Sequence, residues 1–424
     1  MFWALNSIVL GLTGSITIGY IICLFSAQMA ALIMTFLYYL RPAEKAVYPY
    51  PIVMVGLIIA TLTLVMHRKP YSSISTFERK DTLLFVIMQL YLLFNILLYN
   101  RWTIIDLYQS YIIPAAILFF LISEYATSIK QLRLLLLSIG FPALIICADS
   151  LHVHFMAEHT SSIWLHYHLV DSAGGARLIN LGWWDNPNKL AYLSNLGFLC
   201  FLISGILSSG AKRLMYFSTA GIFLPTLFLT GSRGALLQLC VSCFFFFIKS
   251  KKNTRTVIIA ASAIFIAFTY LSALSPDREY AEGSTDERIE ILLYAKEVFK
   301  SHPIFGVGFK LFPEYNPFRL VTHNTFAQLL VELGLVGTII FFFMVKRMFS
   351  GTYLIIAKSR DNKELSEIHT LSKGIFAISI GAFVYYIFGN QLLDFMFCTI
   401  IGMLVAAKRA YELHIHNSDS ETSG

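Results

Sequence analysis

The sequence predicts an all-α polytopic membrane protein, and three observations support this fold class. Of its 424 residues, 57% are hydrophobic and only 13% are charged, whereas a soluble domain carries about 25% charged residues. Apolar runs of roughly 20 residues recur along the chain, each long enough to cross a bilayer as a helix. None shows the strict alternation of apolar and polar residues that marks a membrane strand. We therefore expect residues 1–424 to form a single integral membrane domain with about 12 transmembrane helices.

The expected spans follow one another closely from the N-terminus. Residues 1–40 are apolar throughout and, at about 1.5 Å per residue, would extend roughly 60 Å, which is too long for one crossing. Two helices, or one helix and a half-inserted segment, are both compatible with this stretch. The further expected spans are residues 51–66, 82–99, 106–125, 132–149, 188–208, 213–229, 234–249, 255–275, 325–345, 372–388 and 391–407.

The distribution of Lys and Arg predicts the orientation of these spans. When the spans are counted alternately, the basic loops all fall on one side, which the positive-inside rule assigns to the cytoplasm. The strongest of them are residues 67–80, 249–255 and 346–363. The tail of residues 410–424 also falls on this side, and we expect disorder from residue 414. The net charge of +7 is therefore a signal of orientation, and no nucleic-acid partner is expected.

The two longest loops, residues 150–187 and 276–322, fall on the opposite, outer side. Both contain apolar and aromatic residues that suit packing at the membrane interface. Trp183 and Trp184, for example, are of the residue type that is enriched at membrane–water interfaces. We expect the larger loop to contain short interfacial helices and to carry active-site residues.

Arg233 lies in a short turn, residues 229–235, between two apolar spans. A guanidinium so close to the hydrocarbon is costly unless it extends to the interface or is paired. A simple interfacial turn residue is one interpretation. The other is a phosphate-binding fork, because Arg presents planar, permanently charged donors.

Arg288 lies at the start of a second polar motif. Residues 289–299 have the apolar spacing of an amphipathic helix, and residues 284–286 are suitable caps. This places Arg288 in the first turn of an interfacial helix. A salt bridge to a neighbouring carboxylate is the alternative to a binding role. The following Gly306-Val307-Gly308 is only a weak signal for a phosphate-binding loop.

His323 and Asn324 precede the next apolar helix. The macrodipole at a helix start disfavours the imidazolium form, so His323 is expected to be neutral and able to accept a proton near pH 7. Glu332 follows about nine residues later, roughly 13 Å deeper along a straight helix. We expect it to bind a structural partner rather than the substrate. Gly334 and Gly337 would allow close helix packing.

The smaller outer loop contains two His-x-His pairs, at His152 and His154 and at His166 and His168. Such pairs could coordinate zinc, but their irregular spacing argues against a metal site. Asn188 follows this loop, in a turn that leads into the next span.

Together, the motifs between residues 180 and 340 resemble the O-antigen ligase and polymerase superfamily. They occur in the family's order, and the set is specific although each motif alone is not. The N-terminal half resembles the family only as a helical scaffold. The matching motifs are residues 186–188, 229–235, 286–288, 302–308, 323–324 and 328–337.

The resemblance implies a glycosyltransferase of the bacterial inner membrane with its active site, and both outer loops, in the periplasm. Its donor would be a glycan on undecaprenyl pyrophosphate. In a ligase the acceptor is the sugar of the lipid A-core of lipopolysaccharide. The family's essential arginines match Arg233 and Arg288, and its essential histidine matches His323. No metal, nucleotide or other cofactor is implied.

The residues suit this chemistry independently of the resemblance. Two arginines would stabilise a departing pyrophosphate, and His323 would accept the proton of an attacking hydroxyl. Asn324 and Asn188 are expected to help bind the substrates. An O-antigen polymerase and a protein O-oligosaccharyltransferase are alternatives within the superfamily. A flippase or exporter of the same lipid-linked glycan is an alternative from another class.

Overall fold

The computed structural model describes residues 27–40, 76–99, 112–125, 128–156, 169–172, 175–180, 184, 186–248, 278–389 and 393–422. Of these residues, 83% are helical, which confirms the predicted α-helical class. The elements are α2 (Ala27–Leu40), α4 (Thr76–Leu98), α6 (Ile113–Tyr125), α7 (Ile129–Met156), β1 (Leu169–Ser172), β2 (Gly175–Leu178), α8 (Pro187–Ile206), α9 (Gly210–Leu229), α10 (Arg233–Phe247), α12 (Arg278–Ser301), η6 (Phe312–Tyr315), α13 (Thr325–Ser359), α14 (Ser366–Tyr385) and α15 (Phe395–Thr422).

Five of the described helices are long and apolar enough to cross a membrane, so the protein is a multi-pass membrane protein. They are α4, α7, α8, α13 and α14. The expected spans 51–66 and 255–275 lie outside the described residues, as do residues 1–26. The expected total of about 12 crossings therefore stays a prediction.

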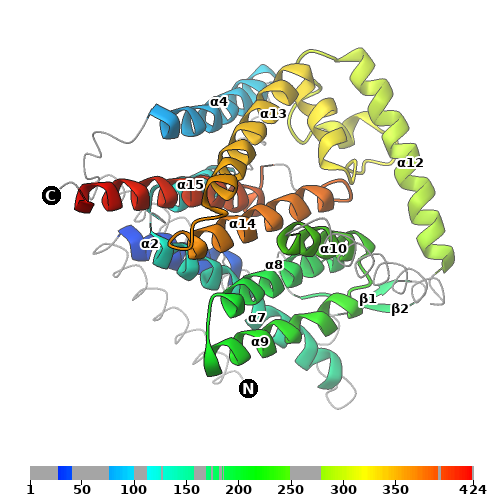
Figure 1. Cartoon of the computed structure of the whole chain (residues 1–424). Coiled ribbons are helices and arrows are strands. Elements are labelled where there is room, and N and C mark those ends of the chain that lie inside the picture. The colour runs from blue at the N-terminus through cyan, green and yellow to red at the C-terminus, as the bar shows by residue number, and fades with distance from the viewer. Residues whose placement is uncertain are drawn as a thin grey trace, which may run out of the picture.

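Helix α14 lies in the middle of the bundle, in contact with α8, α10, α13 and α15 (Figure 1). Helix α9 packs on α8, and α4 packs on α13. Side chains such as Phe119, Phe201 and Phe341 are fully buried in one apolar core that runs through these contacts. The bundle thus fixes the positions of the helix ends, where the polar motifs lie.

Basic residues gather at one end of the bundle, which we call the basic end. Arg133, at the start of α7, pairs with Glu367 at the start of α14, at 3.1 Å. Lys373 donates to the carbonyl oxygen of Ile248, at the end of α10, at 2.8 Å. The opposite end, which we call the site end, contains the starts of α8 and α10 and the end of α14.

Three features differ from the sequence-based expectations. The segment expected as the outer loop of residues 150–187 contains an antiparallel β-hairpin, in which Leu169 pairs with Leu178 and Ser172 with Gly175. Trp184 is buried in the protein, where its indole N–H donates to the carbonyl oxygen of Tyr39 at 3.3 Å. The expected disorder from residue 414 is wrong as far as Thr422, because α15 continues to that residue.

Candidate active site

His323 lies directly before α13 in an unusual backbone conformation. Its φ is 50°, in the left-handed region that few residues other than glycine adopt. Asn324 caps the helix, since its Oδ1 accepts from the N–H groups of Phe326 and Ala327 at 2.9 and 3.0 Å. The Thr322 hydroxyl donates to the carbonyl oxygen of Asn324 at 2.8 Å. A strained backbone conformation that neighbouring contacts hold in place is typical of functional sites.

Helix α12 brings two charged residues to His323. Burial lowers the pKa of His323, the positive charge of Arg288 lowers it further, and the negative charge of Glu287 opposes both. The half-buried imidazole is therefore held in its neutral form near pH 7. Arg288 lies in the interior of α12, because the helix begins at Arg278. The expected place of Arg288 in the first helical turn is thus wrong: the residues before the expected cap are already helical.

Arg233 begins α10 and is exposed. The hydroxyl of Ser232 accepts from the N–H of Ala235 at 3.4 Å and caps the helix. Gly231 precedes the cap with a φ of 61°, which glycine adopts without strain. The turn between α9 and α10 thus presents a guanidinium at a helix N-terminus, where the macrodipole attracts anions.

Arg177, on strand β2, is not among the residues that the sequence motifs single out. Its Nε donates to the carbonyl oxygen of Thr230 at 2.8 Å, and its NH2 group lies 3.5 Å from the Oδ1 of Asn188. It therefore joins the hairpin, the Arg233 turn and the start of α8. One sequence signal could have found it: Arg177 is the sole Lys or Arg in the outer loop of residues 150–187.

The end of α14 links the start of α10 to the start of α13. Phe388 lies so close to Gly234 that a Cβ atom there would be 3.2 Å from the Cβ of Phe388. The next residue, Gly389, accepts at 3.0 Å from the hydroxyl of Thr325, whose N–H donates to Tyr386 at 2.9 Å. The structure therefore brings Arg233 and His323 to the same end of the bundle. Asn188 lies at the same end, because Arg177 contacts both Asn188 and the turn before Arg233.

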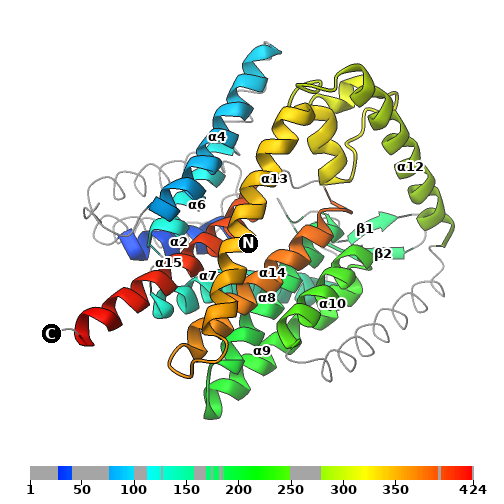
Figure 2. The ribbon, with the colours of Figure 1, turned by 45° about the horizontal axis from the view of Figure 1, so that its top comes forward.

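Helix α13 is two helices that fold back on each other. Gly334 interrupts it with φ 65° and ψ −169°. The rings of Phe326 and Phe342 stack with centroids 6.1 Å apart, whereas a straight helix would separate these residues by roughly 24 Å. Figure 2 shows the shorter segment beside the longer one, between it and α12. The expected single span of residues 325–345 is therefore wrong, because the chain reverses at Gly334.

The reversal changes the position of Glu332. Its carboxylate accepts from the backbone N–H of Lys310 at 2.8 Å and from the Nε2 of Gln328 at 2.9 Å. It therefore lies against the segment that contains Lys310, and the expected position roughly 13 Å deeper along a straight helix is wrong. The expectation of a structural partner agrees with these contacts.

The motif of residues 302–308 packs into the reversal. The N–H groups of Val307 and Gly308 donate to the carbonyl oxygens of Val331 and Glu332 at 2.9 and 3.0 Å. Those two N–H groups are therefore already used, so the Gly-x-Gly motif here stabilises the fold and does not present both to a phosphate. Helix α4 holds the same region from the other side, since Asn95 bonds the carbonyl of Phe305 at 2.9 Å.

A known family matches the segment that contains the candidate residues. Residues 218–342 match the family model of O-Antigen ligase. The matched segment runs from α9 into the longer part of α13 and includes Arg233, Arg288 and His323. No curated protein matches the chain.

The described helices define a multi-pass membrane protein. Within it, residues 218–342 are similar to the O-antigen ligase family, which agrees with the resemblance that the motifs carry.

Proposed function

We propose that this protein is an O-antigen ligase of the bacterial inner membrane. It would transfer a glycan from undecaprenyl pyrophosphate to the sugar of lipid A-core, at a site that faces the periplasm. The main observation in support of this proposal is that Arg288 lies close enough to His323 to lower its pKa, so that a neutral histidine and an arginine are neighbours at the site end. His323 and Arg288 supply a base and a cation, and Arg233 adds a second cation at a helix N-terminus.

The pyrophosphate of the donor would lie among the cations of the site end. Arg233 and Arg288 offer bidentate hydrogen bonds to phosphate oxygens. The N-termini of α8, α10 and α13 add partial positive charge. Arg177 orients the Arg233 turn and Asn188. Asn324 uses its Oδ1 for the helix cap, so any substrate contact would come from its side-chain NH2 group.

The reaction is a single displacement at the anomeric carbon. The acceptor hydroxyl oxygen attacks that carbon while the bond to the pyrophosphate oxygen breaks. The electron pair leaves with undecaprenyl pyrophosphate, whose added charge the arginines stabilise. The hydroxyl proton passes to His323, which is neutral before the reaction. Attack opposite to the leaving group inverts the anomeric configuration.

Within the superfamily, the large loop before His323 favours a ligase. The gel pattern of lipopolysaccharide from a deletion strain separates the alternatives. Loss of a ligase leaves core without O-antigen, while polymer accumulates on the carrier lipid. Loss of a polymerase instead leaves core that bears a single repeat. Unchanged lipopolysaccharide, with altered glycosylation of proteins, would indicate the protein O-oligosaccharyltransferase.

A flippase or exporter would need arginines for the pyrophosphate but would have no use for a base. His323→Ala separates this class from the transferases in an assay with purified protein, donor and core acceptor. We expect the variant to remain folded and to bind carrier lipid, while transfer falls by about 10²-fold or more. Full transfer by this variant would exclude His323 as the base. The wild type is expected to be equally active with and without EDTA.

A further inference from the structure

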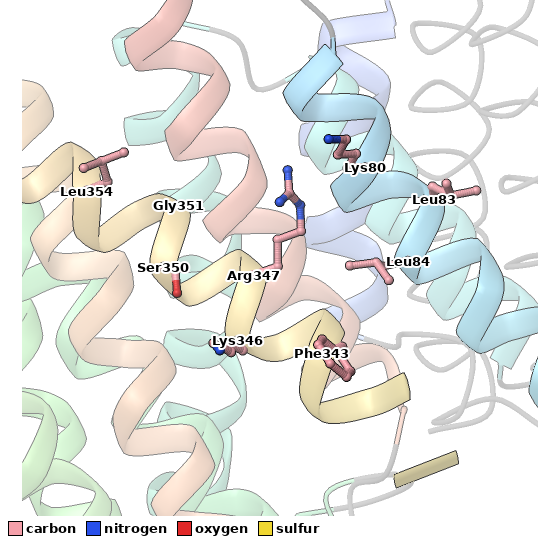
Figure 3. Close-up of a pocket in the computed structure, with 9 residues that line it drawn as sticks. All are labelled: Lys80, Leu83, Leu84, Phe343, Lys346, Arg347, Ser350, Gly351 and Leu354. Carbon is pink, nitrogen blue, oxygen red and sulfur yellow. The ribbon is translucent and has the colours of Figure 1, made fainter. Parts of the chain in front are cut away.

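A cavity of about 540 Å³ lies between α4 and α13, toward the basic end of the bundle and away from the candidate active site. Its size is within the usual range of ligand pockets. Figure 3 shows the lining side chains, which come from α4 and α13. They are Lys80, Leu83, Leu84, Phe343, Lys346, Arg347, Ser350, Gly351 and Leu354.

The lining residues present a basic region next to an apolar one. Phe343, Arg347, Ser350 and Leu354 recur at helical spacing, so they share one face of α13. On α4, Leu83 and Leu84 follow Lys80 by about one turn, toward the middle of the helix. A ligand in this pocket would therefore meet cations at one end and leucine and phenylalanine at the other.

The charges around the pocket are predominantly positive. The buried carboxylate of Asp81 forms ion pairs with Arg347 and Lys408, both at 2.5 Å. Lys80 and Lys346 are exposed and add two further cations. Glu412 is a second carboxylate close to Lys408 and Asp81. Among the side chains that the structure describes around the pocket, cations outnumber carboxylates, so a bound anion would offset an excess of positive charge.

The surroundings of the pocket favour a lipid over a soluble anion. Leu83, Phe343 and Leu354 are 55%, 60% and 48% exposed, and in a membrane such side chains face acyl chains. Basic pockets between transmembrane helices at the cytoplasmic interface are suited to acidic headgroups. The stem of Lys408 lies behind Gly351, where a Cβ atom would be 3.2 Å from its Cδ. This contact closes the pocket on the side of α15.

We propose that the pocket between α4 and α13 binds an anionic glycerophospholipid. Lys80, Lys346 and Arg347 contact the phosphate, and the acyl chains lie along Leu83, Leu84 and Phe343. Asp81 keeps Arg347 in place at the edge of the pocket. This site requires only that the chain spans a membrane, so it is independent of the transfer reaction.

The test uses the purified full-length protein in detergent. Phosphatidylglycerol and phosphatidylcholine with the same acyl chains are added separately, and lipid retention is measured by native mass spectrometry and melting temperature. We expect phosphatidylglycerol to be retained and to raise the melting temperature more than phosphatidylcholine. Equal effects of the two lipids would overturn the proposal. An equal rise with inorganic phosphate alone would also overturn it, in favour of a free-anion site.

Two variants locate the binding. The double variant Lys80→Glu and Lys346→Glu should weaken phosphatidylglycerol binding by about tenfold or more. The matched control is Lys130→Glu with Lys212→Glu, which changes the same charge at exposed positions of the basic end. An equal loss in both doubles would indicate general surface attraction and overturn the pocket. Ser350→Trp fills the pocket without changing its charge and should also abolish binding; full retention would contradict the proposal.

Discussion

The guanidinium of Arg177 donates a 2.8 Å hydrogen bond to the backbone carbonyl of Thr230, although the two residues are 53 positions apart in the chain. This contact fixes the turn that carries Arg233 against the β-hairpin. Arg177 also reaches Asn188 at 3.5 Å. The hairpin thus has a clear structural role, because it orients the residues that we propose to bind the donor.

Replacement of Arg177 should therefore impair the reaction without removing the base. We expect Arg177→Ala to lower kcat/KM for the lipid-linked donor by about tenfold to 100-fold, because the Arg233 turn loses its support. The loss should appear mainly in the KM of the donor, while the pH profile set by His323 stays unchanged. The control is Arg213→Ala at the basic end, where the side chain is exposed. Equal kinetics for both variants would show that Arg177 has no positioning role.

Arg233 and Arg288 are predicted to act through the shape of their guanidinium groups. Arg233→Lys and Arg288→Lys keep the charge but remove the bidentate fork. We expect each to lower the rate of transfer by roughly 10²-fold, which is the usual loss when one hydrogen-bond donor to a developing negative charge is removed. The measurement is initial rate with saturating acceptor, together with donor binding. Wild-type turnover in both variants would mean that charge alone is sufficient.

The sequence is sufficient to predict the helical class and the boundaries of α8 and α10. Long apolar runs bounded by Gly, Ser and Asn predict α8 to within a few residues, because local composition determines both the span and its cap. Arg233 and His323 stand out in the sequence because polar residues beside apolar runs are costly in a membrane, and Arg288 stands out at the start of an amphipathic segment; their roles stay predictions.

Long-range contacts account for what the sequence does not predict. The reversal at Gly334 looks in the sequence like a small residue in a continuous apolar helix. It forms because Gly306 and the loop around it fill the space beside the backbone of Glu332. The contacts of Arg177 are not predictable from the sequence, because its partners Thr230 and Asn188 lie in other segments of the chain; its only local signal is that no other Lys or Arg occurs in residues 150–187. No local pattern encodes such pairings.

The reversal at Gly334 is expected to be indispensable for folding. A Cβ at Gly334 would lie 2.3 Å from the carbonyl oxygen of Ile304, and one at Gly306 would lie 2.4 Å from the backbone of Glu332. Both residues also have positive φ values. Gly334→Ala and Gly306→Ala should therefore destabilise the protein by about 2 kcal/mol or more.

Thermal unfolding in detergent measures this effect. Gly221→Ala is the matched control, because nothing lies within 4 Å of a Cβ at that position in α9. Alanine there should be neutral or slightly stabilising, since it favours a helix more than glycine does. If Gly334→Ala melts at the same temperature as Gly221→Ala, the close packing described for the reversal is wrong.

The pH dependence of transfer should report the environment of His323. Its pKa lies below the ordinary value of a histidine, because burial and Arg288 disfavour the charged form. The neutral imidazole is the active form, so activity should be full at pH 7 and fall as the pH drops through a value below about 6.5. Glu287 raises this pKa, and Glu287→Gln should therefore shift the midpoint to still lower pH. The prediction is wrong if the midpoint of Glu287→Gln moves to higher pH. It is also wrong if the residual activity of His323→Ala falls at low pH as it does in the wild type, because another group would then set the profile. The control is Glu290→Gln on the same helix, for which we expect the wild-type midpoint.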